Sequence, residues 1–137
     1  MKPQELRIGN TIMCQCRGEY KPHTIKSIWY NDEEKLYFVE LDNGFQCNIN
    51  GITPIPITDE LLLKCGFKKD VEANSLYRYA IDNCLFEIRL WGIGTLIKLE
   101  NYCEDCVRKV HLPKTPNLHQ LQNAYYLVTG KELEIEF

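Results

Sequence analysis

The sequence lacks any apolar run that approaches the roughly 18 residues needed to cross a membrane. Residues 1–7 also lack the apolar core of a signal peptide. We therefore expect a cytoplasmic protein with no membrane partner. Internal repeats, low-complexity runs and flexible linkers are missing too, so the 137 residues fit one compact domain, residues 1–137.

Catalytic signatures are equally scarce. The chain has no Gly-x-Ser-x-Gly turn for a nucleophilic serine, no Gly-x-x-x-x-Gly-Lys phosphate loop and no His-Glu-x-x-His zinc motif. It has only three histidines to act as general acids or bases. We expect a binding protein rather than an enzyme, with no cofactor.

Positive charge is in short supply, because 16 Lys and Arg face 19 Asp and Glu, for a net charge of −3. Sequence-independent binding to a nucleic-acid backbone needs clustered Lys and Arg, which displace counterions from the phosphates. Nucleic acid is therefore not the expected partner, although a local basic patch is compatible with this total.

Seven cysteines are present, which is a high and odd number. Without a secretion signal, reduced thiols are the expected state, some of them buried as small apolar side chains. The competing interpretation is a structural zinc held by Cys103, Cys106 and His111, since two thiolates two residues apart fit one tetrahedral ion. No second matched pair of cysteines follows, so metal is not expected.

The first half, residues 1–57, has short segments rich in β-branched and aromatic residues, separated by turns. Residues 42–44, Asp-Asn-Gly, give a strong hairpin signal. Close turn spacing predicts a small bent antiparallel β-sheet or an SH3-like partial barrel.

The second half, residues 58–137, begins with a short central helix, which Thr58 caps and Gly66 ends. Alternating segments then predict a second antiparallel sheet. The spacing of Asn117 and Gln120 forms a capping box for a C-terminal helix packed on that sheet. Residues 133–137 alternate and predict a terminal strand. The fold class is therefore α+β.

Two arginines are the main candidates for ligand contact. Alternation places Arg78 and Arg89 on the polar faces of successive strands, and a hairpin turn at residues 82–83 would bring them to one outward surface. Two guanidinium groups can hold a phosphate by bidentate hydrogen bonds. The competing interpretation is a surface ion pair between Glu87 and one of these arginines.

A second candidate is the cluster of His119, Gln122 and Asn123 in the C-terminal helix. Two amides and an imidazole offer donors and acceptors for a nucleobase or another polar ligand. The alternative is structural: His119 serves the helix start, and the amides face solvent or bond to a neighbouring strand.

Three segments carry a resemblance: ELRIGN at residues 5–10, IPITDELLLKCGF at 55–67 and HQLQNAYYLVTGKEL at 119–133. In this order they resemble a family of small proteins from bacteriophages and prophage-like regions of Bacteroidota. The resemblance implies a phage accessory context and brings no activity or catalytic residue.

Together these observations predict a phage-type accessory binding protein that acts in counter-defence. It would sequester a small signalling nucleotide or block a host protein, and its self-association is left open. The alternative is a nucleic-acid-associated SH3-like module with a structural zinc.

Overall fold

The computed structural model describes residues 1–73, 76–81, 84–91, 94–101 and 106–137. Contacts divide the chain into two compact units. Unit 1 comprises Met1–Ile55 and Asn117–Asn123, and unit 2 comprises Pro56–Pro116 and Ala124–Phe137. The predicted halves, 1–57 and 58–137, lie close to this division, except that residues 117–123 return to unit 1. That the chain folds as one domain stays a prediction.

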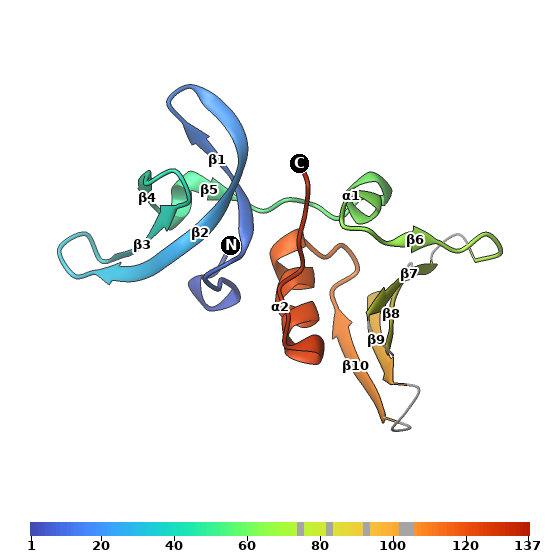
Figure 1. Cartoon of the computed structure of the whole chain (residues 1–137). Helices are drawn as coiled ribbons and strands as arrows, with labels where there is room; N and C mark the ends of the chain where they lie inside the picture. The colour runs from blue at the N-terminus through green and yellow to red at the C-terminus, as the bar shows by residue number, and fades with distance from the viewer. Residues whose placement is uncertain (74–75, 82–83, 92–93, 102–105) are drawn as a thin grey trace. The chain divides into compact units, whose positions relative to one another are not determined.

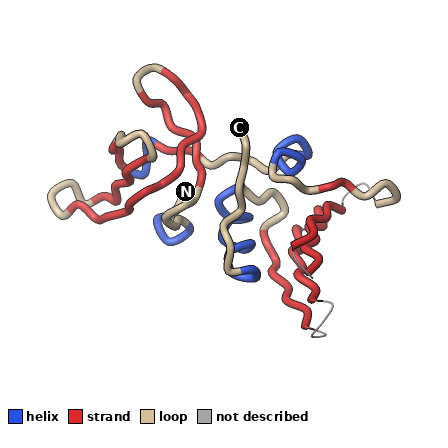
Figure 2. Tube along the Cα trace, viewed as in Figure 1, coloured by secondary structure: helices blue, strands red, loops and turns tan. Residues whose placement is uncertain are grey.

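The α+β class is confirmed, with two antiparallel sheets and two α-helices (Figure 2). None of the helices in the described part of the chain is long and apolar enough to span a bilayer.

Unit 1 is built on a five-stranded sheet in the order β4-β3-β2-β1-β5. Its strands are β1 (Thr11–Cys16), β2 (Glu19–Asn31), β3 (Leu36–Leu41), β4 (Gln46–Asn48) and β5 (Ile52–Thr53), with single 3-10 turns η1 (Pro3–Glu5) and η2 (Ile49–Gly51). Long β2 pairs with β1 through its first part and with β3 through its second (Figure 1). The register shifts between Ile25 and Ser27, and such irregularities bend a strand. The result is the predicted bent sheet, a curled half-barrel.

The concave side of this half-barrel is apolar. Alternate residues of β1 are buried there with side chains from the other strands, and the cluster consists of Ile12, Cys14, Cys16, Ile25, Val39, Leu41 and Ile52. Two of the seven are cysteines that serve as small apolar groups.

Buried amides tie residues 117–123 to β1. Gln122 is 2% exposed, and its Oε1 accepts a hydrogen bond from the Thr11 backbone N–H at 2.8 Å. Its Nε2 donates to Thr11 Oγ1 at 3.2 Å. Because both ends of the buried amide are used, the polar group is accommodated inside an apolar surrounding.

Asn123 forms the same kind of link with the N-terminal segment. Its Oδ1 accepts from Asn10 Nδ2 at 2.8 Å and from Arg7 Nε at 3.2 Å. Its Nδ2 donates to the Glu5 carbonyl at 2.8 Å. Two adjacent side chains of α2 therefore satisfy five polar groups of the N-terminal stretch, residues 5–11.

Unit 2 contains a second five-stranded sheet, a meander in the order β10-β9-β8-β7-β6. Its elements are α1 (Asp59–Lys64), β6 (Lys68–Lys69), β7 (Leu76–Ile81), β8 (Cys84–Trp91), β9 (Gly94–Asn101), β10 (Cys106–Leu112) and the second half of α2 (Leu118–Thr129). The predicted helix starts are confirmed: Thr58 Oγ1 accepts from Leu61 N, and Gln120 Oε1 accepts from Asn117 N. Strand β10 was not predicted.

One face of this sheet packs against α2. The Phe86 ring meets Tyr125 edge-on at 5.0 Å between centroids and Phe67 at 5.7 Å. Tyr77, Phe86 and Ile88 are fully buried. Because side chains alternate along a strand, residues of the other parity lie on the opposite face.

The predicted terminal strand is wrong. Residues 131–137, all described, belong to no strand, and Figure 2 shows them as a loop. Leu133 is nevertheless buried, with 5% exposure. Alternating polarity indicates that one side of a segment is covered, but it does not by itself supply the ladder of backbone hydrogen bonds that defines a strand.

We predict that Gln122→Ala lowers the free energy of unfolding by about 1–3 kcal/mol, because it leaves a buried Thr11 N–H without its acceptor. Urea denaturation measures the change. The matched control is Gln46→Ala in the same unit, where an exposed amide bonds to Glu40 and a change within about 0.5 kcal/mol is expected. Equal effects of the two substitutions would contradict the structural role of Gln122.

Candidate functional site

The register of the second sheet lines up one charged side chain from every strand. Directly opposite residues share a face, and one such row consists of Lys68, Arg78, Glu87, Lys98 and Lys109. Arg89 lies two residues from Glu87 and so on the same face. We call these six side chains the charged face; it is the face opposite Phe86.

Glu87 is the buried centre of the charged face, with 4% exposure. Its Oε1 accepts a hydrogen bond from Arg78 Nε at 3.0 Å, and its Oε2 lies 3.8 Å from Arg89 Nη2. The ion pair expected as the alternative is therefore present. A buried carboxylate needs a cationic partner. Glu87 has two, the guanidinium groups of Arg78 on β7 and of Arg89 on β8.

Both arginines remain half-exposed. The Arg78 side chain is 46% exposed although Nη1 also lies 2.7 Å from Asp70 Oδ2, and the Arg89 side chain is 43% exposed. Arg78 is therefore fixed by two carboxylates while part of its surface faces solvent. The structure thus brings together these two predicted residues on one face, as the alternation indicated.

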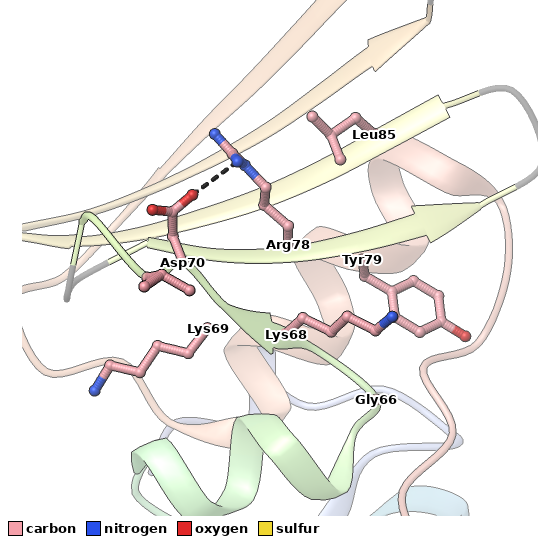
Figure 3. Close-up of a pocket in the computed structure, with 8 residues that line it drawn as sticks. Gly66, Lys68, Lys69, Asp70, Arg78, Tyr79 and Leu85 are labelled. Atoms are coloured by element: carbon pink, nitrogen blue, oxygen red, sulfur yellow. Dashed lines mark ion pairs between the residues drawn. The ribbon is translucent and has the colours of Figure 1, made fainter.

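A pocket of about 520 Å³ opens beside Arg78 (Figure 3). It is lined by Gly66, Lys68, Lys69, Asp70, Val71, Arg78, Tyr79 and Leu85. The pocket lies where β6, only two residues long, ends and β7 continues past it. The edge of the sheet is therefore hollowed next to a cationic row.

The aromatic wall of the pocket is Tyr79. Its ring passes so close to Gly66 that a methyl group there would lie 2.9 Å from Tyr79 Cε2, and Gly66 has a φ of +87°. Glycine suits both requirements. Lys68 extends toward this ring whereas Lys69 points away (Figure 3). Within the described residues Lys68 has no carboxylate partner, so the pocket combines an exposed ammonium group with a ring face.

Asp70 is the one carboxylate among the described residues that line the pocket. Its Oδ1 accepts from the backbone N–H groups of Ala73 and Glu72, each at 2.9 Å. These bonds, and then the Arg78 charge, lower the pKa of Asp70. The carboxylate is therefore ionised, and it balances part of the positive charge of Arg78.

The other predicted cluster lies in unit 1. The amides of Gln122 and Asn123 bond to the protein's own chain, as described above. His119 is 1% exposed, and neither ring nitrogen has a hydrogen-bond partner within the described residues. Burial lowers the pKa of His119, which favours the neutral imidazole.

The residues proposed for zinc are only partly described. Cys103 lies outside the described residues, as does the side chain of Cys106, while His111 is exposed on β10. Among the described side chains no three or more His, Cys, Asp or Glu are arranged to hold a metal ion. The zinc alternative therefore stays untested.

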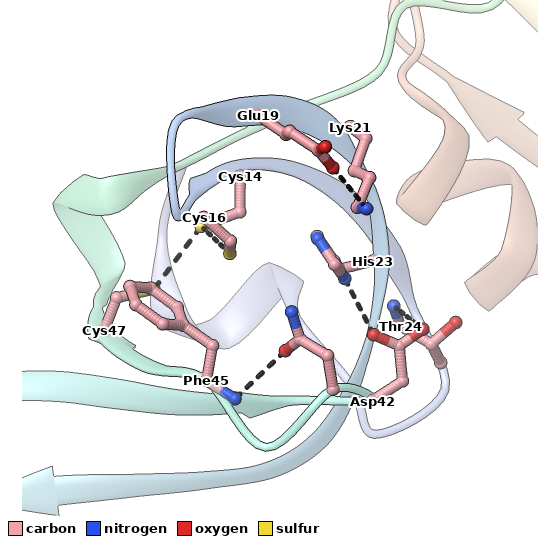
Figure 4. A network of polar contacts seen from close by, with 10 residues as sticks. Cys14, Cys16, Glu19, Lys21, His23, Thr24, Asp42, Phe45 and Cys47 are labelled. Atoms are coloured by element: carbon pink, nitrogen blue, oxygen red, sulfur yellow. Dashed lines mark hydrogen bonds and ion pairs between the residues drawn. The ribbon is translucent and has the colours of Figure 1, made fainter.

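Sequence reasoning did not anticipate the three neighbouring thiols inside unit 1 (Figure 4). Cys14 Sγ lies 3.4 Å from Cys16 Sγ and 3.9 Å from Cys47 Sγ, and all three are free. Burial, and then the hydrogen bond with Cys16, raises the pKa of Cys14 to about 12. The Cys14 thiol is therefore protonated near neutral pH and packs as part of the core.

We predict that Asp70→Asn destabilises the protein near pH 7, because it keeps the backbone acceptor but removes the charge facing Arg78. The folded pKa of Asp70 is lowered, so its contribution is complete above the ordinary value of about 3.9 and is lost as pH falls through the folded pKa. The stability gap between variant and parent should close in acid.

Urea denaturation over a pH series measures this gap. Asp32→Asn is the control, since Asp32 is exposed and has no ion-pair partner within the described residues. A gap for Asp70→Asn that stays constant as pH is lowered would show that its charge plays no part.

Comparison of the chain with protein-family models, with curated proteins and with solved structures gives no match. The resemblance to phage-type proteins of Bacteroidota therefore stays a prediction. The functional inference rests on the charged face and its pocket.

Proposed function

We propose that the chain is a non-enzymatic binding protein whose ligand is a small phosphorylated, nucleotide-like molecule held in the pocket beside Arg78. The observation that carries this proposal is the presence of Arg78, Lys68 and Tyr79 around one cavity. A guanidinium and an ammonium group suit a phosphate, and a ring face suits a base.

The phosphate subsite would be organised before the ligand arrives. Arg78 is anchored by Asp70 at 2.7 Å and by Glu87 at 3.0 Å, yet it is 46% exposed. A side chain already held in place loses less conformational entropy on binding. Lys68 adds a positive charge that no described carboxylate neutralises.

The remaining walls fit the rest of a nucleotide. A volume of about 520 Å³ lies within the range of roughly 300–1,000 Å³ usual for small-molecule sites. Tyr79 offers a surface for stacking, and Leu85 adds apolar contact. Asp70 can accept a hydrogen bond from a sugar hydroxyl or a base N–H.

The biological role we propose is sequestration. In the phage setting that the resemblance implies, the captured molecule would be a host signalling nucleotide, and its removal would serve counter-defence. The alternative within the same counter-defence role is that the chain binds and blocks a host protein. That alternative predicts that no small nucleotide binds.

We predict that a panel of nucleoside monophosphates, triphosphates and cyclic dinucleotides contains a molecule that raises the melting temperature. Calorimetry should then show that Lys68→Ala weakens its binding tenfold or more, roughly 1.4 kcal/mol. The reason is the loss of the Lys68 ammonium group beside the phosphate. Arg78→Ala should weaken binding as well. It also leaves the buried Glu87 without its hydrogen-bonded partner, so this variant is expected to lose stability too.

Lys64→Ala is the matched control, because it removes the same charge from the same unit at a residue that does not line the pocket. Its affinity should equal that of the parent. Absence of any stabilising nucleotide, or equal affinities of Lys68→Ala and Lys64→Ala, would refute the proposed site.

A further inference from the structure

The charged face continues well beyond the pocket. Lys98 and Lys109 do not line the cavity, yet the register places them in the same cross-strand row as Lys68. Four inter-strand steps of about 4.8 Å separate Lys68 from Lys109, so the row spans roughly 19 Å. A single nucleotide in the pocket would leave half of this row unused.

The row is positive although the chain as a whole is negative. Its carboxylates are already engaged: Glu87 with the two arginines, and neighbouring Glu100 with Lys98 Nζ at 2.7 Å. At the two ends of the row Lys68 and Lys109 are exposed, and neither has a carboxylate partner within the described residues. As far as the described residues show, the face therefore presents cations without carboxylate partners at both ends.

We infer that the charged face is a track for single-stranded nucleic acid. One nucleotide occupies the pocket against Tyr79, and the following phosphates lie over Lys98 and Lys109. The inference rests on the proposed function, because it takes the pocket as the nucleotide subsite and extends the ligand from it.

The shape and chemistry favour a single strand over other polyanions. Tyr79 is paired with Phe86, so its ring comes from the opposite face and lines the pocket only at the open edge of the sheet. A row of cations that begins beside this ring combines backbone attraction with base stacking, the combination used by single-strand binders. The carboxylates of an acidic peptide would also match the cations. Such a peptide has no base to stack on Tyr79 next to Arg78 and Lys68, so it would gain less from the pocket.

The test is fluorescence anisotropy with a labelled oligothymidylate of about twelve nucleotides, titrated with full-length protein over a range of potassium chloride concentrations. Each phosphate contact on a single strand contributes about −0.7 to the slope of log affinity against log salt. The double substitution Lys98→Ala with Lys109→Ala should make the slope shallower by about 1.4 and weaken binding at low salt at least tenfold.

The matched control, Lys26→Ala with Lys114→Ala, removes two exposed charges that are not on the charged face and should leave slope and affinity unchanged. No binding of the oligonucleotide, or equal slopes for the two double variants, would overturn the inference. So would displacement of the oligonucleotide more readily by poly-glutamate than by unlabelled oligothymidylate, because the face would then prefer an acidic protein.

The two proposals fail separately. The mononucleotide that stabilises the parent should bind the Lys98→Ala, Lys109→Ala variant with unchanged affinity, because neither lysine lines the pocket. Retained mononucleotide binding without oligonucleotide binding would overturn the track alone. If the parent protein binds no mononucleotide, the pocket is not a nucleotide site, and the proposed function fails.

Discussion

A buried carboxylate at the centre of the second sheet determines what the rest of that face can do. Glu87 is 4% exposed on the middle strand β8, where an unpaired charge would be costly. The cost is offset by Arg78 and Arg89, which approach from β7 and from β8 itself. Arg78 is hydrogen-bonded to Glu87, and Arg89 lies within ion-pair distance of it. Because both arginines remain half-exposed, the interactions that stabilise the sheet also place cations at its surface. Structure and proposed function therefore depend on one ion cluster.

The two units use their sheets differently. In unit 1 the half-barrel encloses an apolar cluster that includes buried thiols, and the amides of Gln122 and Asn123 are consumed by bonds to the N-terminal segment. In unit 2 one face packs rings against α2, and the other carries charge. The two candidate ligand sites of the sequence analysis thus separate into a structural group, Gln122 and Asn123, and an exposed group, Arg78 and Arg89. The exposed group is the one on which both functional proposals rest.

Local patterns were enough to predict much of this fold. Alternation assigned Arg78 and Arg89 to one face, and capping residues located both helix starts. Predicting the register required the turn lengths as well. Ile81 pairs with Cys84 at the end of the β7–β8 hairpin, and Trp91 pairs with Gly94 at the end of the β8–β9 hairpin. Two-residue connections therefore determine which residues lie opposite each other. Applying that rule to the predicted turn at 82–83 would have paired Arg78 with Glu87. Strand β10 was missed because Arg108 and Lys109 interrupt its apolar alternation, and without it Lys109 could not be placed. The terminal strand failed because polarity alone does not supply a hydrogen-bonding partner.

The central claim is that Glu87 positions the arginines for an anion instead of merely neutralising them. The most direct measurement is the affinity for pyrophosphate of the parent and of Glu87→Leu, with folding verified by circular dichroism. Leucine removes a negative charge from a cationic face, so simple charge balance predicts tighter binding. If Glu87 holds Arg78 and Arg89 in place, the affinity instead falls by roughly tenfold, about 1.4 kcal/mol. Tighter binding of pyrophosphate by a folded Glu87→Leu variant would contradict this account.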